Sequence, residues 1–255
     1  MAVQPDIAWE DKPTTFERVD ALLAASDVPA EGLIVLPEMF ATGFSMNVAA
    51  IAEGPDGPTT TYLSGLARRT GCTIVAGLVS AAAGGRGRNQ AVWVGPDGRR
   101  GGHYTKVHPF SIAGEADHYD GGERVVTFPR GDFTVAPLIC YDLRFPETFR
   151  DAVDVGADLF VVIANWPAVR ADHWRALLIA RAIENQACVV GVNRCGDDPH
   201  HAYAGGSLIL DPHGRILAEA ADRPGTIAAS LDHGALADYR RSFDALNDRR
   251  PTAAR

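Results

Sequence analysis

Apolar residues along the chain follow two periods, one typical of β-strands and one typical of amphipathic helices. Short continuous apolar runs predict buried strands, and apolar residues three or four positions apart predict helices. The expected strands cover residues 33–36, 73–79, 90–94, 102–106, 133–139, 159–163, 188–192, 207–210 and 226–231. The expected helices cover residues 13–26, 58–70, 148–155, 172–187 and 235–248. Strands and helices that alternate in this way indicate an α/β domain.

Turn residues mark several boundaries between these elements. Pro96-Asp97-Gly98 follows the strand over 90–94 and predicts a hairpin, and Pro212-His213-Gly214 predicts a second hairpin. Gly71 is expected to end the helix over 58–70, because a glycine in the left-handed conformation often ends helices. The repeated turn hints at two similar halves, but the alternation does not distinguish a doubly wound sheet from a two-sheet sandwich.

Length and charge narrow the classes of protein. The 255 residues are 46% hydrophobic and 22% charged, which are ordinary values for a globular protein with a sizeable core. No linker or low-complexity segment divides the chain, so a single domain over 1–255 is expected. The net charge of −8 comes from scattered acidic residues and argues against nucleic acid or an anionic membrane as a partner.

The N-terminal segment and the cysteines indicate a cytoplasmic protein. The segment MAVQPDIAWEDK has neither the basic nor the apolar region of a signal peptide, and no apolar run is long enough to cross a membrane. Cys72, Cys140, Cys188 and Cys195 are widely spaced and form no CxxC motif. Such cysteines are typical of reduced thiols in a cytosol.

Candidate chemistry concentrates in the segment APLICYDLRFPE, residues 136–147. The buried strand over 133–139 ends in Cys140, so the thiol lies at the carboxyl end of a strand, where open α/β sheets place their ligands. The backbone N–H groups just beyond it, that of Tyr141 first, suit the oxyanion of an acyl transfer. A single cysteine is nevertheless most often a packing residue.

Three further charged residues follow predicted strands or lie close by. Glu38 follows the first strand among apolar neighbours, a partly desolvated setting that suits a general base. Lys106 ends the strand over 102–106, and Glu115 lies nine residues later. Each of these residues alone is most often a solvated surface charge. Together with Cys140 they supply a nucleophile, a base and a cation for an oxyanion.

The three segments PEMFATGF, YTKVHPF and LICYDLRFPE resemble the catalytic segments of the nitrilase superfamily of carbon–nitrogen hydrolases, in the same order. The resemblance extends over the whole chain. It implies a four-layer αββα sandwich that forms a homodimer, with no cofactor. It also implies Glu38 as general base, Lys106 as oxyanion donor, Cys140 as nucleophile and Glu115 as a supporting carboxylate.

Other segments indicate a branch within this superfamily. Residues 164–187, the segment GVNRCG and the loop around Glu115 are similar to omega-amidases, which hydrolyse the terminal amide of 2-oxoglutaramate and 2-oxosuccinamate. Cys140-Tyr141-Asp142 differs from the Cys-Trp-Glu of true nitrilases and favours an amide substrate. Amidases of deaminated glutathione share CYDLRFPE, so that substrate stays open, as do carbamoyl and aliphatic amides.

The expected substrate pocket is lined by Phe44, Phe110, Arg144 and Trp166. Arg144 is suited to bind a carboxylate, although an internal ion pair that holds the turn is an equal alternative. Trp166 follows a strand end and is either a pocket or a core residue. The eight histidines are dispersed without ligand spacing, so no metal site is expected.

The sequence disfavours two other classes of function. A catalytically silent scaffold of the same fold is disfavoured by the complete set of Glu38, Lys106 and Cys140. A nucleotide-binding α/β protein is disfavoured because no glycine fingerprint opens a helix after a strand. The chain also begins with only about half of the first strand usual in the superfamily, which indicates either a misassigned start codon or a short edge strand.

Overall fold

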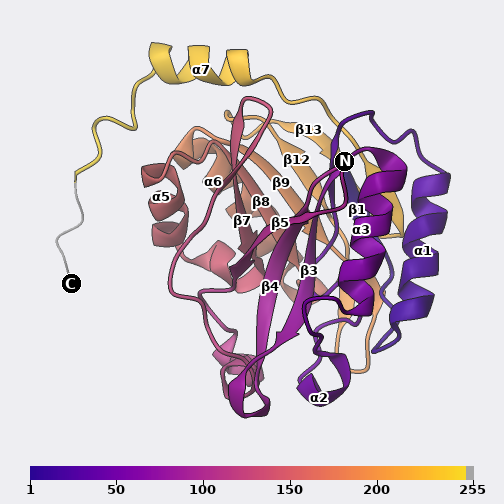
Figure 1. Cartoon of the computed structure of the whole chain (residues 1–255). Helices are drawn as coiled ribbons and strands as arrows, with labels where there is room; N and C mark the ends of the chain where they lie inside the picture. The colour runs from indigo at the N-terminus through magenta and orange to yellow at the C-terminus, as the bar shows by residue number, and fades with distance from the viewer. Residues whose placement is uncertain (251–255) are drawn as a thin grey trace.

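Two six-stranded sheets pack face to face in the computed structural model, which describes residues 1–250 (Figure 1). The first sheet contains, in spatial order, β14 (Gly225–Ile227), β1 (Ala2–Gln4), β2 (Leu33–Val35), β3 (Thr73–Ala81), β4 (Gly87–Val94) and β5 (Arg100–Thr105). The second contains β13 (Ile216–Glu219), β12 (Leu208–Leu210), β9 (Cys188–Asn193), β8 (Leu159–Ala164), β7 (Phe133–Ile139) and β6 (Phe128–Arg130). A separate ribbon pairs β10 (Cys195–Asp197) with β11 (Ala202–Ala204).

Helices cover the outer face of each sheet (Figure 1). The first sheet is covered by α1 (Lys12–Ala24) and α3 (Pro58–Thr70), and the second by α5 (Pro146–Asp154) and α6 (Ala171–Asn185). The remaining helical segments are α2 (Val48–Ile51), α4 (Glu115–His118), α7 (His233–Ser242) and the 3-10 turns η1 (Ala83–Gly85), η2 (Ser111–Ala113), η3 (Cys140–Arg144) and η4 (Ala168–Arg170). The predicted αββα sandwich is confirmed.

The hydrophobic core lies in layers that follow the sheets. Val75 and Ala91 of the first sheet share one buried cluster with Leu138 and Val161 of the second, so the space between the sheets is apolar. A second cluster joins the outer face of the first sheet to α1 and α3. The largest favourable contribution to folding comes from burial of these apolar faces against each other.

Most element boundaries agree with the sequence pattern, and the exceptions lie mainly near the two ends of the chain. Gly71 adopts the left-handed conformation, with φ of 66°, and ends α3 as predicted. The last strand covers only Gly225–Ile227 and the last helix only His233–Ser242, both shorter than predicted. The first strand is short but does not lie at an edge, because β1 pairs with β14 on one side and β2 on the other.

The strand directions bring the candidate residues to one end of the sandwich. β1, β2 and β3 run parallel to one another, as do β7, β8 and β9. Glu38 follows β2, Cys140 follows β7 and Asn165 follows β8, so all three come from carboxyl ends of parallel strands. Lys106 follows β5, which returns antiparallel to β4. Among residues 1–250, no helix is long and apolar enough to cross a membrane.

Gly77 in β3 permits the close approach of the segment that carries Glu38. Its N–H donates to the Pro37 carbonyl at 3.0 Å, and its carbonyl accepts from the Phe40 N–H at 3.1 Å. A Cβ atom at this position would lie 2.4 Å from the Met39 nitrogen and 2.5 Å from the Glu38 Cα. Both atoms belong to the backbone, so a side chain here requires the whole segment to shift.

We therefore predict that Gly77→Ala lowers the free energy of unfolding by at least about 1–3 kcal/mol, the usual cost of overpacking a core. Urea unfolding measures this change. Gly54→Ala is the matched control, because a Cβ there meets nothing within 4 Å. A Gly77→Ala protein as stable as the Gly54→Ala protein would contradict the close approach.

Candidate active site

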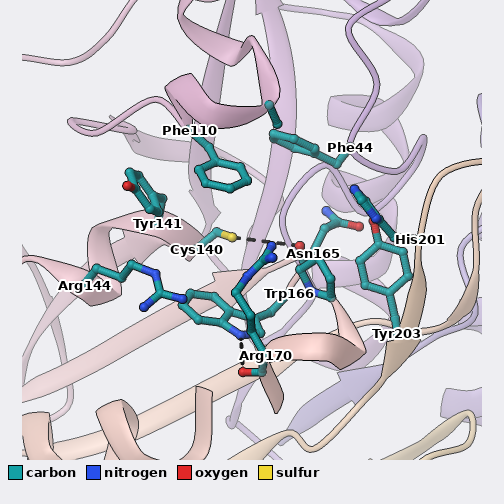
Figure 2. A pocket seen from close by; sticks show the side chains of 12 residues that line it. Phe44, Phe110, Cys140, Tyr141, Arg144, Asn165, Trp166, Arg170, His201 and Tyr203 are labelled. Carbon is teal, nitrogen blue, oxygen red and sulfur yellow. Dashed lines mark hydrogen bonds between the residues drawn. The ribbon is translucent and has the colours of Figure 1, made fainter. Parts of the chain in front are cut away.

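Cys140 lies on a tight turn between β7 and the short helix η3. It is the first residue of η3 and has a φ of 46°, a left-handed conformation that is strained for a residue other than glycine. Its Sγ lies 3.9 Å from the Asn165 carbonyl oxygen, and Figure 2 shows it facing the pocket. Strain of this kind persists where the surroundings hold the backbone in place.

Asp142 is the group that holds this turn. Its buried carboxylate accepts hydrogen bonds from the Ile139 N–H at 3.0 Å and the Tyr104 hydroxyl at 2.8 Å. It also accepts from the His108 N–H at 3.0 Å and lies 2.9 Å from His108 Nδ1. One carboxylate thus fastens the turn of Cys140 to the segment 104–108, which carries Lys106 from the other sheet.

Lys106 is buried between two carboxylates. Its Nζ donates to Glu38 Oε1 at 3.0 Å and to Glu115 Oε2 at 2.8 Å, and both of these carboxylates are fully buried. Burial alone would lower the pKa of the Lys106 ammonium, but the charges of Glu115 and Glu38 outweigh it and raise that pKa well above its ordinary value. Lys106 is therefore a permanent cation in the site.

Two asparagines complete this network. Asn89 Nδ2 donates to Glu38 Oε1 at 2.7 Å and to Glu115 Oε1 at 2.8 Å, so it joins the two carboxylates. The Asn165 N–H donates to Glu38 Oε2 at 2.8 Å, and Asn165 Nδ2 donates to the Glu38 carbonyl at 2.6 Å. Neither asparagine was predicted as a site residue from the sequence. Asn165 directly follows a buried strand, the signal that identified Cys140, whereas Asn89 carries no comparable signal.

The thiol of Cys140 is kept in its neutral form. Burial raises its pKa well above the ordinary value of 9.0, the Glu38 charge raises it further, and the Lys106 charge offsets only part of this. The resting site therefore contains a thiol beside a carboxylate. A nucleophilic thiolate forms only if a proton leaves the sulfur during the reaction.

A small pocket opens in front of Cys140 (Figure 2). The structure places all four expected pocket residues, Phe44, Phe110, Arg144 and Trp166, in its wall. The ring of Tyr141 also lines it and packs against Phe110, with ring centroids 4.7 Å apart. Half of the residues in the wall carry aromatic rings, which favours a small ligand with an apolar body.

Arginine side chains supply the positive charge of the pocket. The Arg144 guanidinium lies 4.9 Å from the ring centre of Trp166 and makes no ion pair with any of residues 1–250, so the expected alternative of an internal ion pair is not found there. Arg170, which the sequence analysis missed, also lines the pocket, and its Cζ lies 5.7 Å from the ring centre of Phe110. It lies in η4, a turn too short to give a periodic signal.

The other three cysteines lie away from this pocket. Cys72, Cys188 and Cys195 are buried, and none of them forms a disulfide within residues 1–250. Within residues 1–250, no group of three or more histidine, cysteine, aspartate or glutamate side chains is arranged to hold a metal ion.

Comparisons with known proteins point to one family. The model of the carbon–nitrogen hydrolase family matches residues 2–241. The omega-amidase YafV of Yersinia enterocolitica is 42% identical over 96% of the chain and 94% of its own length. The 2-oxoglutaramate amidase of Bacillus subtilis is 33% identical over 96% of the chain and 95% of its own length. Among solved structures, the chain resembles a CN-hydrolase superfamily protein from Xanthomonas campestris that has an arsenic adduct in its active site. The TM-score is 0.91 and the identity 34%, over 99% of this chain and 97% of that protein.

The raised pKa of Cys140 makes a direct prediction for the folded protein. Because the charged form is disfavoured, the ultraviolet thiolate absorbance that separates wild type from Cys140→Ser should stay flat from neutral pH to about pH 9.0, the ordinary pKa of a thiol. A step near neutral pH would show instead that the resting nucleophile is a thiolate.

Proposed function

The chain belongs to the carbon–nitrogen hydrolase family, and we propose that it hydrolyses the terminal amide of a small 2-oxo acid of the 2-oxoglutaramate type, with release of ammonia. It is a cysteine-dependent amidase. The observation that carries the substrate proposal is the combination of Cys140 with cations in one small aromatic pocket. The names of the relatives support the same substrate class.

In the first half of the proposed reaction, Cys140 Sγ attacks the amide carbonyl carbon while Glu38 accepts the thiol proton. The oxyanion is stabilised by the Lys106 ammonium and the backbone N–H of Tyr141. The tetrahedral intermediate then loses ammonia, which takes the proton from Glu38, and an acyl thioester remains on the sulfur. The neutral resting thiol makes proton transfer to Glu38 part of the attack.

In the second half, a water molecule attacks the thioester carbonyl and gives a proton to Glu38. The oxyanion occupies the same site beside Lys106. Its collapse breaks the carbon–sulfur bond, the sulfur recovers the proton from Glu38, and the carboxylic acid leaves. Glu115 supports the cycle by holding Lys106 charged and in place, since its Oε2 lies 2.8 Å from the Lys106 Nζ.

The substrate is held by its two ends in this proposal. The aromatic rings of Phe44, Phe110 and Trp166 enclose the short carbon chain, and the guanidinium groups of Arg144 and Arg170 line the same pocket, where an anionic end can reach them. A carboxylate is the group that an unpaired guanidinium binds most strongly. This arrangement favours a small carboxylated amide over a neutral one.

We extend the proposal to a homodimer in the cytoplasm, which the family resemblance implies. Val155 at the end of α5 and Ile183 on α6 are large apolar side chains that the single chain leaves exposed. Exposed apolar residues on helices that pack together are of the kind that a second copy covers.

The decisive experiment measures ammonia release from 2-oxoglutaramate by wild type and Cys140→Ala. Wild type should turn over and Cys140→Ala should lose all activity, because no other thiol lines the pocket. Cys72→Ala is the control, a buried cysteine remote from the site, and should keep its turnover. Comparable activity in Cys140→Ala would refute the mechanism, and an inactive wild type would refute the substrate.

The two lysines of the chain provide a matched pair of variants. Lys106→Ala should lower kcat/KM by about 2.7–4 kcal/mol of transition-state stabilisation, as other oxyanion donors do. Lys12 forms an ion pair with the buried carboxylate of Glu53, outside the pocket. Lys12→Ala should therefore lose stability with little loss of kcat/KM. A loss in Lys106→Ala below tenfold would contradict its role.

A further inference from the structure

Two guanidinium groups enter the pocket from different elements. Arg144 ends η3, the short helix that begins at Cys140, and Arg170 ends η4, which follows the strand end at Asn165. Both side chains line the pocket, and Figure 2 shows each extending along its wall. Each is placed by an aromatic ring, that of Trp166 for Arg144 and that of Phe110 for Arg170.

Neither cation has an acidic partner within residues 1–250, although the chain has a net charge of −8. The carboxylates nearest to the nucleophile, Glu38 and Glu115, are both bound to Lys106. Two half-buried guanidinium groups in one small pocket repel each other and lose hydration. An anionic ligand with more than one acceptor group removes both costs at once.

The two guanidinium groups differ in how many donors are free. Arg144 Nη2 lies 3.2 Å from His173 Nδ1, so one of its nitrogens is held by the protein. The guanidinium of Arg170 forms no hydrogen bond within the described residues 1–250, so all of its N–H groups are free to donate to a ligand. A complete fork matches the two oxygens of a carboxylate, whereas a pinned guanidinium with fewer free donors suits a single oxygen.

We propose that Arg170 is the main binding residue for the substrate carboxylate and that Arg144 donates to the neighbouring 2-oxo oxygen. This inference rests on the proposed function and deepens it. Arg170 and Arg144 together bind the whole 2-oxo carboxylate group. The pocket therefore prefers amides of 2-oxo acids to amides of saturated acids, and prefers both of these to neutral amides. The selection is made at the end of the substrate remote from the bond that breaks.

The test uses three amides that lose these groups in turn: 2-oxoglutaramate, glutaramate without the oxo group, and butyramide with neither group. Arg170→Met should reduce the preference for glutaramate over butyramide, measured as a ratio of kcat/KM, by about 10- to 100-fold. Arg144→Met should reduce the preference for 2-oxoglutaramate over glutaramate by about tenfold. Ratios cancel any general damage to the site. Arg99→Met is the control, since that side chain is 88% exposed and outside the pocket.

Binding measured without turnover provides a second readout. In the Cys140→Ala background, Arg170→Met should weaken calorimetric binding of 2-oxoglutarate by about 10- to 100-fold. Unchanged ratios and unchanged binding in Arg170→Met, or equal losses with all three amides, would overturn the inference and leave the proposed function standing. A wild type that hydrolyses butyramide through Cys140 without preferring 2-oxoglutaramate would overturn both.

Discussion

The rest of the site depends on one buried ammonium group. Without Lys106, Glu38 and Glu115 would be two like charges in the protein interior, joined by the amide of Asn89 alone. Breaking a buried ion pair by removing one partner commonly costs about 3–5 kcal/mol, because the remaining charge has no compensation. Glu38 comes from the end of β2, Lys106 from the end of β5, and Glu115 from α4. Their mutual attraction therefore fixes three segments relative to one another.

The nucleophile stays protonated despite this ammonium group. Lys106 lowers the pKa of the Cys140 thiol, but burial and the Glu38 charge raise it by more. A permanently ionised thiolate would also react with electrophiles other than the substrate. In the proposed mechanism the Cys140 thiol loses its proton only when Glu38 and the amide carbonyl carbon of the substrate are both in position. The left-handed backbone of Cys140, held by Asp142, fixes the sulfur in this geometry.

The sequence predicted the residues whose signal is local and missed those defined by contacts between distant segments. Glu38 and Cys140 each follow an apolar run, and the carboxyl ends of parallel strands meet at one edge of a sheet. Asn89 joins two carboxylates only because β4 places it next to two segments distant in the sequence, the one that follows β2 and the one that forms α4. Strands of three residues, such as β10, are too short to show a period, and so is the turn that carries Arg170. The full-length helices and strands were predictable because each buries one continuous face.

The position of β1 has a consequence for how the molecule is made. Ala2 pairs with Ile227, so strands from opposite ends of the sequence lie side by side inside the first sheet. The ribosome releases the N-terminal end first, and that sheet lacks one neighbour of β1 until almost the whole chain has emerged. Domains larger than about 100–150 residues commonly fold through intermediates with exposed apolar surface. The partly synthesised chain therefore exposes one edge of β1 until β14 has emerged.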